Sequence, residues 1–149
     1  MAENKIEIFY KDEKHFDKPM GSPRPRFRRV KQFVQTYMPT HYTKHKNFIA
    51  DQMTDLKSER DIKLTVEFYF PPLKSWSKKK LTAMLTRYKN TKPDLDNLLK
   101  TVLDAGNGKL WNDDNQIVEI RTFKKYSDIA RTVLIIEELS DDDVQPLQR

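Results

Sequence analysis

Residues 92–108 of this 149-residue chain read KPDLDNLLKTVLDAGNG. Five apolar residues in this stretch recur at the spacing of one helical face: Leu95, Leu98, Leu99, Val102 and Leu103. The two glycines at 106 and 108 are typical of a helix end. The stretch therefore predicts an amphipathic helix that begins near Leu95, ends at the glycines and covers a core with its leucine face.

The flanking segments predict both strands and helices. Alternating apolar residues predict four strands, at residues 6–10, 64–70, 116–125 and 132–138. Within the last, the run Val133-Leu134-Ile135-Ile136 predicts burial on both faces. Apolar spacing predicts a helix over 39–58 and a basic helix, capped by Ser75 or Ser77, that continues to Tyr88. Three prolines predict that residues 17–31 form an extended, polyproline-like arm.

This order of elements favours one fold class. Read along the chain it is β, arm, α, β, α, α, β, β, which is an α+β pattern with a small mixed β-sheet packed by helices in a single domain. We assign residues 1–139 to this domain and expect residues 140–149 to form an acidic, disordered tail.

The composition excludes several classes of protein. The chain has no cysteine, which rules out a disulfide scaffold, a thiolate zinc site and a cysteine nucleophile. No apolar run approaches the roughly 18 residues of a membrane span, and the first residues lack the hydrophobic region of a signal peptide. We therefore expect a soluble, cytoplasmic protein with no membrane partner.

Positive charge is concentrated in two segments. Residues 18–31 and 77–93 each contain six Lys or Arg and no acid, so the rest of this +6 chain carries a net charge of −6. Two concentrated basic segments on an otherwise acidic chain favour a polyanionic partner, and nucleic acid is the usual one. A solvated surface is the alternative interpretation of either segment alone.

Acidic residues and one lysine gather at the start of the leucine-striped helix. Asp94 and Asp96 stand two apart where a proline keeps the backbone extended, so their side chains point the same way. Lys100 follows Asp96 by four residues, on the helix edge turned away from the leucines. Asp113 and Asp114 come after the glycine turn, which returns the chain toward the same region.

Two interpretations of these residues are open. Taken singly, the aspartates are typical of helix N-caps and turns, and the lysine of an exposed ion-pair partner. Taken together, converging carboxylates require a cation or raised pKa values, and Mg²⁺ prefers such oxygen ligands. On a DNA-binding surface such an ion would activate water for attack on phosphorus. The lysine would offset the transition-state charge or protonate the leaving oxygen.

Other metal and phosphate sites do not fit the spacing. From Asp94, the fifth position of a calcium loop falls on Leu98, which has no ligand atom. His41 and His45 have the spacing of a helical zinc pair, but Tyr42 stands where a zinc protease carries glutamate. We expect both histidines to be exposed to solvent. Three glycines in the whole chain do not allow a Gly-rich phosphate loop.

Several motifs taken together carry a family resemblance. They are KPDLDNLLK at 92–100, LD and NG within 103–108, and WNDDNQIV at 111–118, with PRPR at 23–26 and SWSKKK at 75–80 upstream. Over nearly the full chain these residues resemble the RusA family of Holliday-junction resolvases, particularly forms from phages and prophages of Gram-positive bacteria. The carboxylate–lysine element followed by DDxQ is long and order-dependent, which makes it more specific than a lone carboxylate pair.

The resemblance implies a homodimeric, Mg²⁺-dependent endonuclease that nicks two strands of a four-way DNA junction at symmetric positions, in recombination and repair. It implies metal-binding carboxylates at Asp94, Asp96 and Asp114 and an essential lysine at Lys100, with Asp113 as a secondary candidate. It also implies a bacterial or phage-infected bacterial cell, Mn²⁺ as a substitute ion and no small-molecule cofactor.

The basic segments supply the expected DNA contacts. Ten side chains are expected to bind phosphates: Arg24, Arg26, Arg28, Arg29, Lys78, Lys79, Lys80, Arg87, Lys89 and Lys92. Two other functions stay open on the sequence. One is a non-catalytic protein that binds branched DNA, and the other is a Mg²⁺-dependent nuclease for flaps or forks in phage replication.

Overall fold

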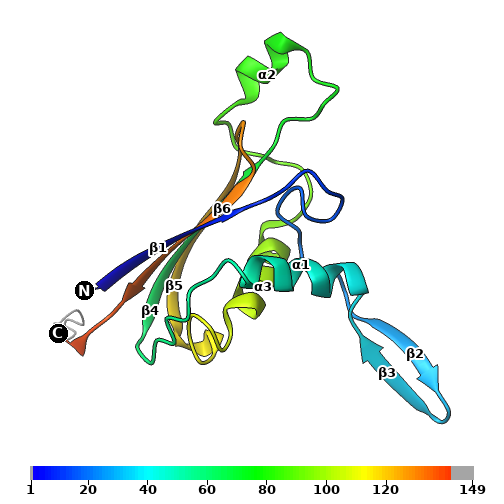
Figure 1. Ribbon diagram of the computed structural model, residues 1–149, viewed down its shortest axis with the longest axis vertical. Helices are drawn as coiled ribbons and strands as arrows, with labels where there is room; N and C mark the ends of the chain where they lie inside the picture. The colour runs from blue at the N-terminus through cyan, green and yellow to red at the C-terminus, as the bar shows by residue number, and fades with distance from the viewer. Residues whose placement is uncertain (1, 142–149) are drawn as a thin grey trace, which may run out of the picture.

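A computed structural model describes residues 2–141, so positions 142–149 of the predicted tail lie outside the described residues. A four-stranded sheet in the order β1-β6-β4-β5 forms the body, and a separate two-stranded hairpin projects from it (Figure 1). The strands of the large sheet are β1 (Ala2–Phe9), β4 (Ile62–Phe70), β5 (Ile117–Tyr126) and β6 (Arg131–Glu138).

The large sheet is mixed, as predicted. β4 and β5 run parallel, whereas β6 pairs antiparallel with both β1 and β4. Because parallel neighbours need a long crossover, the chain between β4 and β5 has room for two helices, α2 (Lys78–Met84) and α3 (Leu95–Gly106). The connection that makes the sheet mixed therefore carries the acidic helix.

Strand periodicity explains the core. Every second residue of β4 is buried, from Ile62 through Val66 to Phe70, since successive side chains point to opposite faces. β6 lies between β1 and β4. Two of its consecutive residues, Val133 and Leu134, are only 4% and 0% exposed although their side chains point to opposite faces. The prediction that this run is buried on both faces is confirmed for Val133, Leu134 and Ile136, whereas Ile135 is half-buried.

Two helices pack on the sheet. α1 (Thr40–Ala50) and α3 contact each other and add their buried residues to the same core as the strands (Figure 1). In α3 the predicted apolar stripe faces inward, with Leu98 and Val102 buried. Within residues 2–141, no helix is long and apolar enough to cross a membrane.

The first helix is shorter than predicted. It ends at Ala50, whereas the prediction continued it to residue 58. The carbonyl of Ala50 accepts a hydrogen bond from Lys109 Nζ at 2.6 Å. Two residues later, the amide side chain of Gln52 pairs with the backbone N–H and C=O of Phe9, both at 2.9 Å. These long-range contacts divert the chain toward α3 and β1, although the apolar spacing continues the helical pattern.

Part of the predicted extended arm is a hairpin. β2 (Arg26–Val30) pairs antiparallel with β3 (Phe33–Tyr37) across a turn at residues 31–32. The sequence prediction missed this pairing because the turn has no Asn-Gly, Asp-Gly or glycine pair.

The basic helix also stops earlier than predicted. It ends at Met84, whereas the prediction continued it to Tyr88. Thr86 has a positive φ of 70°, and Tyr88 forms an isolated bridge to Lys125 in β5. The backbone near Tyr88, which the local spacing assigned to the helix, therefore pairs with the edge strand β5 instead.

The expectation that both histidines of α1 are exposed was wrong for His45, which is completely buried. Its ring stacks with Tyr10 and Phe16, and its Nδ1–H donates to the carbonyl of His15 at 2.6 Å. Nε2 has no hydrogen-bond partner within the described residues. Burial lowers the pKa of His45, because the charged imidazolium would lose its hydration.

This pKa shift predicts acid sensitivity. An unfolded histidine has a pKa of about 6.5, so below that pH the unfolded chain binds a proton that neutral, buried His45 does not. The free energy of unfolding should therefore fall as the pH drops from about 6.5 toward the lower folded pKa. Denaturant titrations at pH 7.5 and 5.5 should show this loss, and it should shrink in His45→Phe. An NMR titration that places the pKa of His45 at or above 6.5 would contradict the prediction.

A second prediction concerns the end of α3. A Cβ at Gly106 would lie 2.5 Å from Cζ2 of the buried Trp111, whereas a Cβ at Gly108 would meet nothing within 4 Å. Gly106→Ala should therefore lower the free energy of unfolding by about 1–3 kcal/mol through overpacking. Gly108→Ala, the matched control, carries only the strain of φ +80°, about 1 kcal/mol. An equal loss of stability in both variants, measured by chemical denaturation, would show that the contact with Trp111 is not tight.

Candidate active site

The start of α3 exposes two carboxylates. Asp94 occupies the N-cap position with extended backbone, but its side chain accepts no capping hydrogen bond. Asp96 lies in the first turn, and both residues are exposed. Within residues 2–141 neither carboxylate takes part in an ion pair. The capping interpretation therefore lacks its hydrogen bond, and both groups are free to bind a cation.

A residue that the sequence prediction missed holds the chain in front of these carboxylates. Lys124 of β5 donates through Nζ to the carbonyls of Thr91 and Pro93, each at 2.8 Å. A lysine in a strand 30 residues downstream gives no local signal for this role. Because Pro93 directly precedes Asp94, these two bonds tie the entry of α3 to the sheet.

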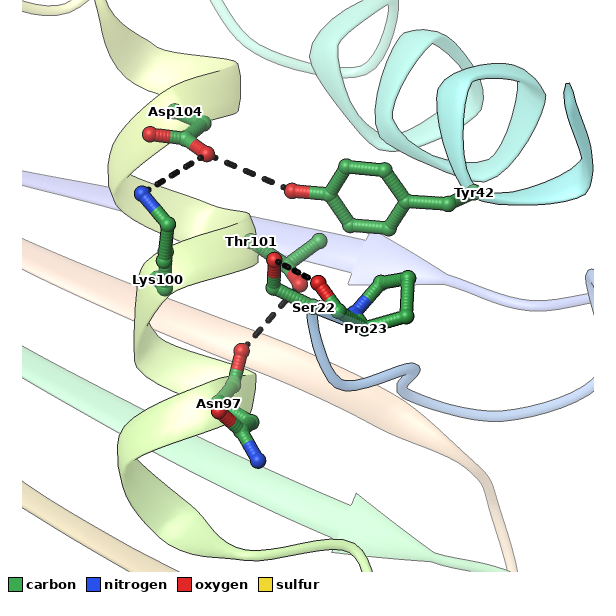
Figure 2. A network of polar contacts seen from close by, with 7 residues as sticks. All are labelled: Ser22, Pro23, Tyr42, Asn97, Lys100, Thr101 and Asp104. Atoms are coloured by element: carbon green, nitrogen blue, oxygen red, sulfur yellow. Dashed lines mark hydrogen bonds and ion pairs between the residues drawn. The ribbon is translucent and has the colours of Figure 1, made fainter. Parts of the chain in front are cut away.

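Lys100 lies on the next part of the same helix edge. Its Nζ forms an ion pair with Asp104 at 3.5 Å, and Asp104 also accepts a hydrogen bond from the Tyr42 hydroxyl at 3.3 Å (Figure 2). Burial raises the pKa of Tyr42, so its hydroxyl stays a donor. The series Asp96, Lys100, Asp104 repeats every four residues, which places the three side chains along one edge. Asp104 belongs to the quoted motif, but the sequence assigned it no role.

The acidic turn is fixed by Trp111 and Gln116. Trp111 is fully buried and its Nε1–H donates to Asn107 Oδ1 at 2.7 Å. Gln116 Oε1 accepts from the backbone N–H of Asn112 and Asp113 at 2.8 and 3.0 Å, while its Nε2 donates to the carbonyl of Ser58 at 2.8 Å. The glutamine of the DDxQ motif is therefore structural, because it fastens the turn to the segment before β4.

The turn brings Asp114, in the short 3₁₀ helix η1 (Asp114–Gln116), beside the middle of α3. Its pKa is raised, first by partial burial and then by the hydrogen bond and negative charge of Asp113 and the charge of Asp104. The positive charge of Lys100 lowers the pKa of Asp114, but its effect is smaller. The structure therefore gathers Asp104, Asp114 and Lys100 within electrostatic reach of one another.

The predicted metal ligands are only partly assembled. Within residues 2–141 no three acidic or histidine side chains form a group close enough to hold a metal ion. The donor chemistry nevertheless fits Mg²⁺, which proteins commonly bind through one or two carboxylates, several waters and substrate phosphates. Exposed Asp94 and Asp96, together with Asp114, offer such an open set of oxygen ligands.

Parts of the two basic segments lie at opposite ends of the molecule. Arg24 and the three arginines of β2 are exposed at the hairpin, and Lys78–Lys80 begin α2 at the other end (Figure 1). The segments meet nearer α3, where Lys18 of the first and Lys89 and Lys92 of the second line one cleft. Arg87 and Lys92 are exposed, whereas Lys89 is half-buried over Phe70.

A cleft of about 460 Å³ adjoins Pro93, directly before Asp94. Five lysines line it: Lys11, Lys18, Lys74, Lys89 and Lys92. Lys11 and Lys74 were missed from sequence, since each stands alone among uncharged or acidic neighbours and only the fold brings it to the cleft. Asp12 and Asp17 also line the cleft, so the lysines leave it with a net positive charge near the exposed carboxylates.

Comparison with known proteins gives the family. The model of the endodeoxyribonuclease RusA family matches residues 17–137, which include the hairpin, α3 and the acidic turn. The chain therefore belongs to the RusA family of endodeoxyribonucleases, and the resemblance drawn from the motifs is confirmed.

One curated relative matches part of the chain. The chain is 38% identical over 84 residues to protein YqaN of Bacillus subtilis (strain 168). The alignment covers 53% of this chain and 58% of the relative, so the chain spans less than two thirds of the relative's length.

The contact between α1 and the lysine edge gives a testable prediction. Tyr42→Phe removes the hydroxyl that bonds to Asp104 and should lower the free energy of unfolding by about 1 kcal/mol. Tyr88→Phe is the matched control, because Tyr88 is 69% exposed, and it should leave stability unchanged. Equal unfolding midpoints for Tyr42→Phe and the unaltered chain in urea would show that the hydroxyl contributes nothing.

Proposed function

We propose that this chain is a Mg²⁺-dependent endonuclease of branched DNA that resolves four-way junctions by paired nicks, in recombination and repair. The observation that carries the proposal is the exposed Asp94–Asp96–Lys100 edge of α3, with Asp114 beside Lys100, in a member of an endodeoxyribonuclease family. The two acid-free basic segments that precede α3 in the sequence, residues 18–31 and 77–93, supply the affinity for a polyanion.

Each residue has a role in this proposal. Asp94, Asp96 and Asp114 would hold the ion, which when bound polarises a phosphoryl oxygen and lowers the pKa of water. Lys100 offsets the negative charge that develops on the phosphoryl oxygens or protonates the leaving oxygen. Asp104 keeps the Lys100 ammonium on the solvent side of the edge through their 3.5 Å ion pair. Asp113, hydrogen-bonded to Asp114, tunes the acidity of that carboxyl group.

The substrate has a symmetry that the protein can match. A four-way junction has two-fold symmetry, and a C₂ dimer presents one site to each of two opposed strands. We therefore propose that a homodimer is the active species. Arginines and lysines that contact phosphates position the junction without reading its bases, so binding should weaken steeply with salt.

Replacing one ligand tests the metal assignment. Asp94→Asn should lower the rate of Mg²⁺-dependent junction nicking by at least about 100-fold, because a ligand charge is lost. Binding in EDTA should stay equal or tighten, because a negative charge near phosphate disappears. Asp55→Asn, an exposed aspartate outside the site, is the control and should cut normally. Normal nicking by Asp94→Asn would remove this residue from the metal site.

A substrate panel tests the specificity. Labelled junction, flap, fork and linear duplex of matched sequence should be incubated with the protein and Mg²⁺, and the junction should be cut fastest. Equal rates on flap or fork would count against a resolvase and favour a replication nuclease. Binding without any cleavage would favour a non-catalytic branched-DNA-binding protein.

A further inference from the structure

The β2–β3 hairpin is a separate projecting element. All ten of its strand residues are exposed or half-exposed, none belongs to the hydrophobic core, and it forms its own two-stranded sheet (Figure 1). An isolated two-stranded hairpin is marginally stable in water. Its retention as a projection is therefore explained by a role outside the fold.

The hairpin exposes large apolar side chains. Phe33 is 75% exposed, and Phe27 and Val34 are each 70% exposed, the highest fractions of any large hydrophobic residue that the structure describes. Clustered apolar side chains on a surface mark an interaction site, because their exposure to water is unfavourable. Nothing within residues 2–141 covers them, so the partner is another molecule.

Cations alternate with these apolar groups on both faces. The register opposes Arg29 to Val34 and Arg28 to Gln35. Since alternate residues share a face, Phe27 lies with Arg29, and Phe33 lies with Arg28. Each face of the hairpin therefore presents an aromatic ring next to a guanidinium group. This combination is typical of surfaces that bind a nucleic-acid backbone and stack on its bases.

The tip adds one more cation in an unfavourable conformation. Lys31 has a positive φ of 56° in the turn, a region that costs a residue with a side chain about 1–2 kcal/mol and that glycine adopts freely. A lysine there places its charge at the end of the projection, between the two strands. The sequence thus has a cation where backbone stability alone favours glycine.

The hairpin is rooted beside the candidate active site. The backbone N–H of Ser22 donates to the carbonyl of Asn97 at 2.9 Å, and a Cβ at Gly21 would meet Asn97 Cβ at 3.2 Å. Figure 2 shows Ser22 and Pro23 next to Asn97 and Thr101 of α3. Because Asn97 follows Asp96, the segment that leads into the hairpin leaves the body at the turn of α3 that carries the carboxylates.

The positive charge of the hairpin indicates which class of partner it binds. No Asp or Glu occurs between Asp17 and Asp51, so the hairpin is purely cationic. A second hairpin on this surface would bring like charges together, whereas DNA supplies phosphates for the cations. An exposed aromatic ring can stack only on a base whose face is uncovered. A continuous duplex offers no such base along its length, since its bases are stacked on each other. A branch point interrupts the stack.

We infer that the β2–β3 hairpin enters the branch point of junction DNA, where Phe27 and Phe33 stack on bases that lack a stacking neighbour and the surrounding cations hold phosphates. The inference rests on the proposed function for its substrate, and it assigns to the hairpin the selection of branched over linear DNA. The hairpin is thus the element that determines structure specificity, separate from the residues that break the phosphodiester bond.

Binding measurements in EDTA test this without relying on cleavage. Phe27→Thr combined with Phe33→Thr removes both rings but keeps strand propensity. At one fixed salt concentration the affinity for a junction should fall about 10-fold or more, while the affinity for linear duplex of the same sequence stays within about 2-fold. Val118→Thr, a 56% exposed apolar residue of β5 that lies outside the hairpin and the lysine-lined cleft, is the matched control and should change neither affinity.

A ring-for-ring replacement reports stacking directly. Phe33→Trp should keep the junction affinity, and the fluorescence of the added indole should be quenched by junction DNA but not by linear duplex. Unchanged junction affinity in the Thr variant, an equal loss on junction and duplex, or quenching by both DNAs would each overturn the inference. So would a shift of the Thr variant to a lower molecular mass in light scattering, which would place the rings in a contact between copies of this chain.

The two proposals fail separately. The proposed function is judged by Mg²⁺-dependent nicking and its loss in Asp94→Asn, whereas the hairpin is judged by junction selectivity in the absence of metal. Selective binding without nicking would support the hairpin inference and refute the nuclease. Nicking by a protein whose Thr variant retains full junction selectivity would support the nuclease and refute the hairpin inference.

Discussion

The contact between Trp111 and Gly106 is the constraint on which the candidate site depends. The indole is completely buried at the end of α3, and it lies so close to Gly106 that no side chain fits there. The ring thereby forces the chain to reverse within a few residues, and its hydrogen bond to Asn107 closes the turn. The residues that follow in sequence are the acidic turn, which this reversal returns to the flank of α3.

The same helix serves the core and the site because its two faces carry different chemistry. Leu98 and Val102 pack inward, whereas Asp94, Asp96 and Lys100 face solvent. Burial of the apolar face holds the helix in place, so the polar edge is positioned without using its own charges for stability. Under the proposed function, the exposed carboxylates of this edge would bind the cation.

The structure separates two tasks that the charge pattern alone combined. Two basic segments were predicted to bind DNA, and the fold places the arginines of β2 and the lysines of α2 at opposite ends of the molecule (Figure 1). The hairpin end combines several cations with the exposed rings of Phe27 and Phe33 on an element that leads away from α3, whereas the other basic segment exposes the ring of Tyr88. Phosphate attraction is expected of both basic segments, and we propose base stacking for the hairpin. Under that proposal, affinity and structure selectivity reside in different parts of the chain.

The amino-acid sequence by itself determined α3, the strands around Val66 and Leu134, and the position of the acidic turn, because periodic burial and glycine punctuation are local signals. Only the tertiary structure decided where α1 ends, that residues 26–37 form a hairpin, that His45 is buried and that Asp104 and Lys124 support the site. Most of these depend on partners that are distant in the sequence, such as Tyr42 for Asp104 and Thr91 and Pro93 for Lys124, whose approach no local pattern encodes. Side-chain contacts such as that of Gln52 with Phe9 override local propensity, since they satisfy backbone groups that the helix or loop would otherwise leave unpaired.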